Sequence, residues 1–206
     1  MRMADGVAVR VYLHLPKCGG RTFSRMVEAL DPRPRIRYCR APHHANETGD
    51  ADPEWILGHD AKPGSPGVPD GPIRLYVLFR EPIDRTLSHW HAYVIHRTHQ
   101  GKTPKGFESF ATSRRDDMTR IMQGIDLRAI AVAGRTDRFE EFVLAVERDC
   151  GRELPRVPPT PSTPRDERRP ALEDEDQERL RIALETNRRD LELWARLQPI
   201  IERTTR

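Results

Sequence analysis

Short runs of apolar and β-branched residues alternate along this chain with segments whose apolar residues recur at helical spacing. The runs at 8–15 and 73–80 are typical of buried strands, and each is followed directly by a helical pattern, at 22–30 and 83–96. Strands that alternate with helices favour an α/β sandwich. We therefore expect three layers, with a mostly parallel central sheet flanked by helices.

Shorter elements complete this scheme. Further strands are expected at 36–39, 55–59 and 129–133, and further helices within 107–124, at 139–150 and at 172–203. Gly134 is interpreted as the end of the last strand. The prolines between 155 and 170 exclude helix and inner strand there, so we expect a loop, either a lid or a solvated linker. With 206 residues, the chain is predicted to form one domain over 1–206.

The charge balance argues against a large nucleic-acid-binding face. Lys and Arg number 35 against 32 Asp and Glu, and the two signs are interleaved along the chain. A local basic pocket is still compatible with this pattern. No segment approaches the ~20 apolar residues of a membrane span, and no apolar signal region opens the sequence. With three widely spaced cysteines, we expect reduced thiols and a cytoplasmic protein.

The segment Pro16-Lys17-Cys18-Gly19-Gly20-Arg21-Thr22-Phe23 connects the first expected strand to the first expected helix. Gly19 and Gly20 allow backbone angles that turn successive N–H groups inward. The helix N-terminus and Lys17 add positive potential. The segment therefore suits an anion such as a nucleotide phosphate, although a Gly-Gly turn with a purely structural role stays open.

Two other phosphate-handling motifs do not fit this loop. A Walker A motif needs Gly-Lys-Ser/Thr, which the chain lacks, and Lys17 precedes the glycines; ATP or GTP hydrolysis is therefore disfavoured. Cys18 at a helix N-terminus is also compatible with a cysteine phosphatase. Ser24, however, occupies the position where that pattern needs arginine.

A second polar segment follows the strand at 73–80. Arg80 stands at the strand's end, and Ser88 lies about two turns into the next helix. A guanidinium fork and a hydroxyl suit a second phosphate. Two anion sites on neighbouring loops imply a ligand with phosphates at both ends of a nucleoside.

These two segments resemble the sulfotransferases that use 3′-phosphoadenosine-5′-phosphosulfate (PAPS). Residues 16–23 are similar to their PKTGGTT donor loop, and residues 80–88 to their REPxxRxxS segment. The resemblance is to the carbohydrate branch, which includes heparan 2-O-sulfotransferases and bacterial relatives. Weaker similarities continue at 117–120, 134–139 and 187–194.

The resemblance implies a P-loop-like fold that moves the sulfuryl group of PAPS to a hydroxyl of a sugar, glycan or glycosylated metabolite. The product nucleotide would be 3′-phosphoadenosine-5′-phosphate (PAP), and no metal is expected. Lys17 would contact the 5′-phosphate and the bridging oxygen, and Arg80 with Ser88 would bind the 3′-phosphate. The implied donor-binding residues are Lys17, Cys18, Gly19, Gly20, Arg21, Thr22, Phe23, Arg80, Ser88 and Arg165. Cys18 stands where the family usually has threonine.

His59 is our candidate for the general base. It ends the expected strand at 55–59 on the ligand side of the sheet, and histidine titrates near neutral pH. The pair Gly58-His59 also resembles the GH pair of glycan 2-O-sulfotransferases, where this histidine is the base. A polar cap at a strand end is the alternative. His14 is expected to pack or to orient the loop, and the flexible His43-His44 pair to face the acceptor.

Histidines on the helix at 83–96 and just after it do not have the spacing of a standard metal site. These residues are His89, His91, His96 and His99.

Two alternatives to a sulfotransferase stay open: a small-molecule kinase, and a non-catalytic nucleotide-binding relative. Neither the acceptor nor the oligomeric state follows from the sequence, because acceptor pockets are built from variable loops, here 40–54, 61–72 and 97–115.

Overall fold

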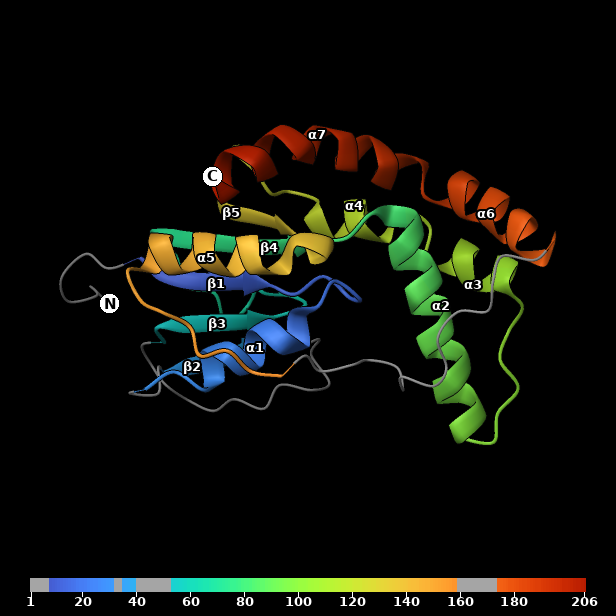
Figure 1. Cartoon of the computed structure of the whole chain (residues 1–206), viewed down its shortest axis with the longest axis horizontal. Helices are drawn as coiled ribbons and strands as arrows, with labels where there is room; N and C mark the ends of the chain where they lie inside the picture. The colour runs from blue at the N-terminus through green and yellow to red at the C-terminus, as the bar shows by residue number, and fades with distance from the viewer. Residues whose placement is uncertain (1–7, 32–34, 40–52, 159–173) are drawn as a thin grey trace. The chain divides into compact units, whose positions relative to one another are not determined.

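The computed structural model describes residues 8–31, 35–39, 53–158 and 174–206, which group into two compact units (Figure 1). The first unit is drawn from 1–79, 124–159 and 197–206, and the second from 80–123 and 160–196. The single domain expected over 1–206 stays a prediction.

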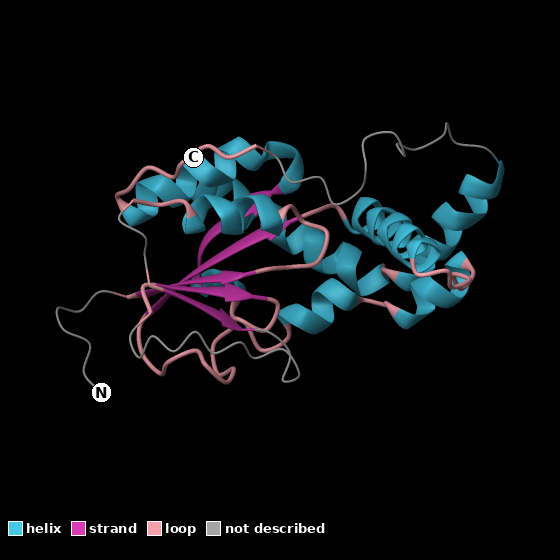
Figure 2. Ribbon diagram, turned by 90° about the horizontal axis from the view of Figure 1, so that it is seen from below, coloured by secondary structure: helices cyan, strands magenta, loops and turns pink. Residues whose placement is uncertain are grey.

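The first unit is built on a five-stranded sheet whose strands all run parallel, in the order β2-β3-β1-β4-β5. The strands are β1 (Val9–Leu13), β2 (Ile36–Cys39), β3 (Trp55–Gly58), β4 (Ile73–Phe79) and β5 (Ile130–Arg135). Their arrowheads point to one end of the sheet in Figure 1, and Figure 2 shows the twist of the sheet. The expected strands and the parallel sheet are thus confirmed.

Helices flank this sheet, which confirms the three-layer α/β sandwich. α1 (Gly20–Glu28) and α5 (Phe139–Cys150) share a buried core with the sheet face that carries Tyr12 and Tyr76. Short 3-10 turns directly precede and follow β5 in the sequence: η3 (Leu127–Ala129) and η4 (Thr136–Arg138). This arrangement places the loop from Pro16 to Gly19 at the carboxyl end of β1, where ligands bind in folds of this class.

Gly134 does not end β5, as the sequence suggested, but lies inside the strand. A Cβ at this position would stand 2.4 Å from the Cβ of Phe142 and 2.5 Å from its ring. Phe142 is fully buried in the core between α5 and the sheet. The glycine is therefore needed for close approach of a helix to the strand, and it does not mark a turn.

The second unit is helical, with α2 (Pro82–His99), α3 (Phe107–Ser113), α4 (Asp117–Met122), α6 (Asp174–Thr186) and the start of α7 (Arg188–Thr205). The Glu81 side chain accepts a hydrogen bond from the Asp84 N–H at 2.7 Å, and Pro82 occupies the first turn of α2. The helix expected at 83–96 is therefore confirmed, together with the proline that starts it.

A buried charge cluster holds these helices together. Arg85 is 1% exposed and pairs with Asp117 at 3.4 Å and with Asp190 at 3.2 Å. Asp190 also accepts hydrogen bonds from the backbone N–H groups of Met118 and Thr119 at 3.0 and 2.7 Å. Removing one partner of such a cluster leaves an uncompensated buried charge, so these residues have a structural role.

The single helix expected at 172–203 is in fact two helices, α6 and α7, separated at Asn187. The Asn187 side chain donates to the carbonyl of Ala183 at 2.8 Å and accepts from the Thr86 hydroxyl at 3.0 Å. An asparagine that satisfies backbone groups in this way favours a helix end. The two helices also differ in burial: Leu180 and Leu184 of α6 are exposed, whereas Leu197 of α7 is buried.

Within the residues that the structure describes, no helix has the length and apolar character needed to cross a membrane.

Candidate functional site

The backbone of the loop at 16–23 takes left-handed angles at two positions. φ is 67° at Lys17 and 79° at Gly19, the N-cap of α1. Glycine adopts this conformation readily, but a residue with a side chain does so at a cost. Such strain clusters at ligand-binding sites, which makes Lys17 a candidate ligand contact. Gly19 has no side chain that could accept from the first N–H groups of α1, and the Thr22 N–H donates to the Gly19 carbonyl at 3.1 Å. A helix start of this kind suits an anion.

Two residues of the loop point their side chains into the protein. The Cys18 thiol is fully buried and donates to the carbonyl of Pro16 at 3.7 Å. The Phe23 ring is also fully buried and packs against Tyr12, with ring centroids 4.5 Å apart. These side chains anchor the loop and α1 to the core, so only their backbone groups are placed for contact with a ligand. A buried thiol also does not suit a cysteine nucleophile.

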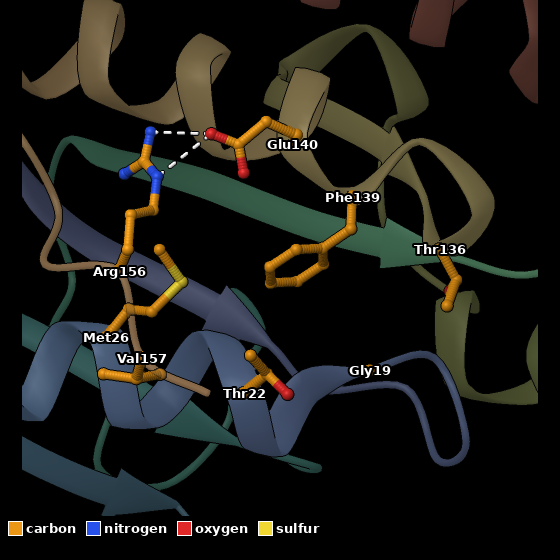
Figure 3. A pocket seen from close by; sticks show the side chains of 8 residues that line it. All are labelled: Gly19, Thr22, Met26, Thr136, Phe139, Glu140, Arg156 and Val157. Carbon is orange, nitrogen blue, oxygen red and sulfur yellow. Dashed lines mark hydrogen bonds and ion pairs between the residues drawn. The ribbon is translucent and has the colours of Figure 1, made fainter. Parts of the chain in front are cut away.

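A pocket of about 560 Å³ opens beside the start of α1. It is lined from α1, from the β5–α5 connection and from the chain that follows α5 (Figure 3). The lining residues are Gly19, Thr22, Met26, Thr136, Phe139, Glu140, Arg156 and Val157. Of these, only Gly19 and Thr22 were expected from the sequence as site residues.

The pocket wall is held by ion pairs and a hydrogen bond. Arg156 contacts Glu140 at 2.8 Å, drawn as a dashed line in Figure 3, and Glu147 at 2.6 Å. The hydrogen bond from Arg156 holds the pKa of the Glu147 carboxyl below its ordinary value, against the opposing effect of burial. Thr136 donates to the carbonyl of Phe79 at 2.9 Å, which fixes the β5–α5 connection to the end of β4.

His59 lies at the carboxyl end of β3, beside the end of β1. The two strands pair in register, Leu13 with Gly58, and the His14 N–H donates to the Gly58 carbonyl at 2.8 Å. The imidazole rings of His14 and His59 are stacked, with centroids 4.4 Å apart and an interplanar angle of 26°. The His59 side chain is exposed, so it is accessible to a substrate.

His14 also contacts the start of α1. A Cβ placed on Gly20 would stand 2.1 Å from the Cδ2 atom of the His14 ring, so the ring lies directly against Gly20. The candidate base and the first residue of α1 therefore contact the same imidazole ring. The sequence predicted that His14 packs or orients the loop, and the structure shows this packing.

The pKa of His14 is lowered to about 3, first by burial and then by the positive potential of His59 and Arg21. In the unfolded chain the pKa returns to 6.5. As the pH falls from 6.5 toward 3, the unfolded state binds a proton that the folded state does not, so folding stability is lost in this window.

We expect the His14 contribution to lower the free energy of unfolding by about 2 kcal/mol between pH 7 and pH 5, since pH 5 lies about 1.5 units below the unfolded pKa. Urea denaturation of the wild type and of His14→Phe at both pH values measures it as the difference between the two pH dependences. An identical pH dependence in the two proteins would contradict the buried, neutral state of His14.

Other expected site residues belong to the second unit or fall outside the described residues. Arg80 and Ser88 belong to the second unit: Arg80 directly follows β4, and Ser88 is half-buried in α2. Arg165, His43 and His44 lie outside the described residues, as does most of the proline-rich segment. Among the residues with described positions, no group of three or more His, Cys, Asp and Glu side chains is arranged to hold a metal ion.

Compared with known proteins, this sequence matches no family model and no curated protein.

Proposed function

We propose that this protein is a PAPS-dependent O-sulfotransferase whose donor loop is 16–23 and whose general base is His59. The observation that carries the proposal is the packing of His14 between Gly20 and His59, because it brings an accessible imidazole close to an anion-binding helix start. Sulfuryl transfer needs these two groups together: donors that hold the phosphosulfate, and a base for the acceptor hydroxyl.

The backbone of His14 prepares His59 for this role. The Nδ1 atom of His59 lies 2.5 Å from the carbonyl oxygen of His14. A carbonyl can only accept, so Nδ1 carries the proton and, in the neutral ring, Nε2 keeps its lone pair. A base with this tautomer can take the proton from an acceptor hydroxyl at Nε2.

In the proposed reaction, the acceptor oxygen attacks sulfur while His59 Nε2 takes the hydroxyl proton. The bond between sulfur and the bridging oxygen breaks, and PAP leaves with the bonding electrons. Lys17 and the N–H groups at the start of α1 stabilise the negative charge that develops on the leaving phosphate. By the resemblance of the sequence, the acceptor is a hydroxyl of a sugar, a glycan or a glycosylated metabolite.

The pocket beside α1 suits the nucleoside part of the donor. It adjoins the loop through Gly19 and Thr22, and Met26, Phe139 and Val157 give it an apolar and aromatic lining. Its volume of about 560 Å³ lies within the range of small-molecule sites. A heterocyclic base in this pocket would leave its 5′-phosphate at the start of α1. The assignment of the 3′-phosphate to Arg80 and Ser88 rests on the sequence resemblance.

Calorimetric titration with PAP tests the proposal. We expect PAP to bind in the presence of EDTA, because the phosphate contacts come from Lys17 and backbone N–H groups and need no metal. A small-molecule kinase would instead bind ATP with Mg²⁺ and leave PAP unbound, and that result would overturn the proposal. A non-catalytic relative would bind PAP but would transfer no labelled sulfate from PAPS in a screen of sugar acceptors.

A further inference from the structure

The His14 ring lies between the donor loop and the candidate base, and it contacts both. One face is stacked on the His59 ring at 4.4 Å, and its Cδ2 and Nε2 atoms lie against the α-carbon of Gly20. The backbone of His14 makes two hydrogen bonds here. Its N–H donates to the Gly58 carbonyl, and its carbonyl accepts from the Nδ1 atom of the His59 side chain. One residue therefore determines where the His59 ring lies and which nitrogen carries its proton.

The electrostatics of this stack favour the same role. Burial, and then the positive potential of His59 and Arg21, oppose a positive charge on His14. Its pKa of about 3 keeps the ring uncharged at neutral pH. When His59 gains a proton from the acceptor, it is stacked on a neutral ring and keeps its hydrogen bond to the His14 carbonyl.

We propose that His14 is a positioning residue for the general base: its ring stacks on His59 and contacts Gly20, and so holds the His59 ring near the loop at 16–23. This inference rests on the proposed sulfotransferase function of the same site. It adds that the placement of the base depends on the start of α1, because a shift of Gly20 displaces the ring that supports His59.

The test compares His14→Ala, which removes the ring, with His14→Phe, which keeps an uncharged ring. Misplacement of a catalytic group by about 1 Å can cost 10²-fold in rate, so we expect His14→Ala to lower kcat by about 10- to 100-fold. His14→Phe should retain most of the wild-type kcat. PAP affinity should stay within about threefold of the wild type in both variants, because donor contacts are made by other residues.

A double-mutant cycle separates positioning from general structural damage. In a His59→Ala background, His14→Ala should lower the residual kcat no further, since the group that it positions is gone. An equal loss of kcat in both backgrounds would overturn the inference, as would a wild-type kcat in His14→Ala. A loss of kcat matched by a loss of PAP affinity would show that His14 supports only the donor loop.

NMR relaxation of the His59 ring gives a readout that needs no activity. The ring should be as ordered as its backbone in the wild type and in His14→Phe, and mobile on the ps–ns timescale in His14→Ala. If the wild type binds no PAP and transfers no sulfate, the proposed function fails, and the NMR result still decides on positioning. An equally ordered His59 ring in His14→Ala would overturn the inference. A mobile His59 ring in the wild type would also overturn it, and that measurement requires no variant to fold.

Discussion

Replacement of His59 by alanine is expected to lower kcat by about 10²- to 10⁴-fold, the usual contribution of a positioned general base. PAP affinity should stay close to that of the wild type. His59 contacts His14 rather than the donor loop itself, and its ring is exposed at the end of β3. Removing an exposed ring opens no cavity in the core, so the variant should fold. The measurement is a pair of assays, labelled-sulfate transfer and calorimetry with PAP.

His96→Ala is the matched control for this variant. His96 is an exposed histidine in the last turn of α2, in the second unit, and it lies outside the segment 97–115. The same chemical change at this position should leave both transfer and PAP binding unchanged. Full transfer activity in His59→Ala would move the role of the base to another residue, whereas loss of PAP binding would place His59 in the donor site.

Replacement of Lys17 by methionine is expected to lower kcat by about 10²- to 10³-fold and to weaken PAP binding as well. Loss of one group that stabilises developing negative charge has a cost of this size. Methionine keeps an unbranched side chain at a residue with a φ of 67°, so the strain of the loop is unchanged and the effect reports the charge. Transfer kinetics and calorimetry on the same preparation measure both losses.

Lys17→Arg is the companion variant, because it restores a positive charge at the same backbone position. It should recover part of the PAP affinity and less of kcat, since a guanidinium fork does not replace an ammonium group at one bridging oxygen. Wild-type kinetics in Lys17→Met would show that the loop binds its anion through the backbone alone and that Lys17 has no role in transfer.

Much of the fold could be predicted because apolar periodicity in this chain reflects burial directly. β4 from Leu75 to Phe79 is buried at every residue, as expected for a strand inside a parallel sheet. The alternation of such runs with helical patterns then leads to the α/β sandwich. Two interpretations were wrong for local reasons. Gly134 was expected to end a strand but has a packing role inside β5. One helix was expected at 172–203, but the polar contacts of Asn187 divide it into two.

The candidate site could be predicted only where its residues are close in sequence. Lys17 to Thr22 span the end of the β1–α1 loop and the first turn of α1, so their proximity follows from the chain itself. The stacking of His14 on His59 follows from the pairing of β1 with β3, and strand order cannot be deduced from a single sequence. The pocket could not be predicted from the sequence either, because Phe139 and Val157 meet α1 only through the packing of α5 beside it.

The most direct test of the donor site is a crystal structure of the protein grown or soaked with PAP. We expect the 5′-phosphate at hydrogen-bonding distance, about 3 Å, from Lys17 and the backbone N–H groups that follow it, with adenine in the pocket beside Phe139. A 3′-phosphate held away from Arg80 and Ser88 would refute that assignment alone. PAP bound elsewhere, with no phosphate at the loop from Pro16 to Phe23, would contradict the proposed donor site.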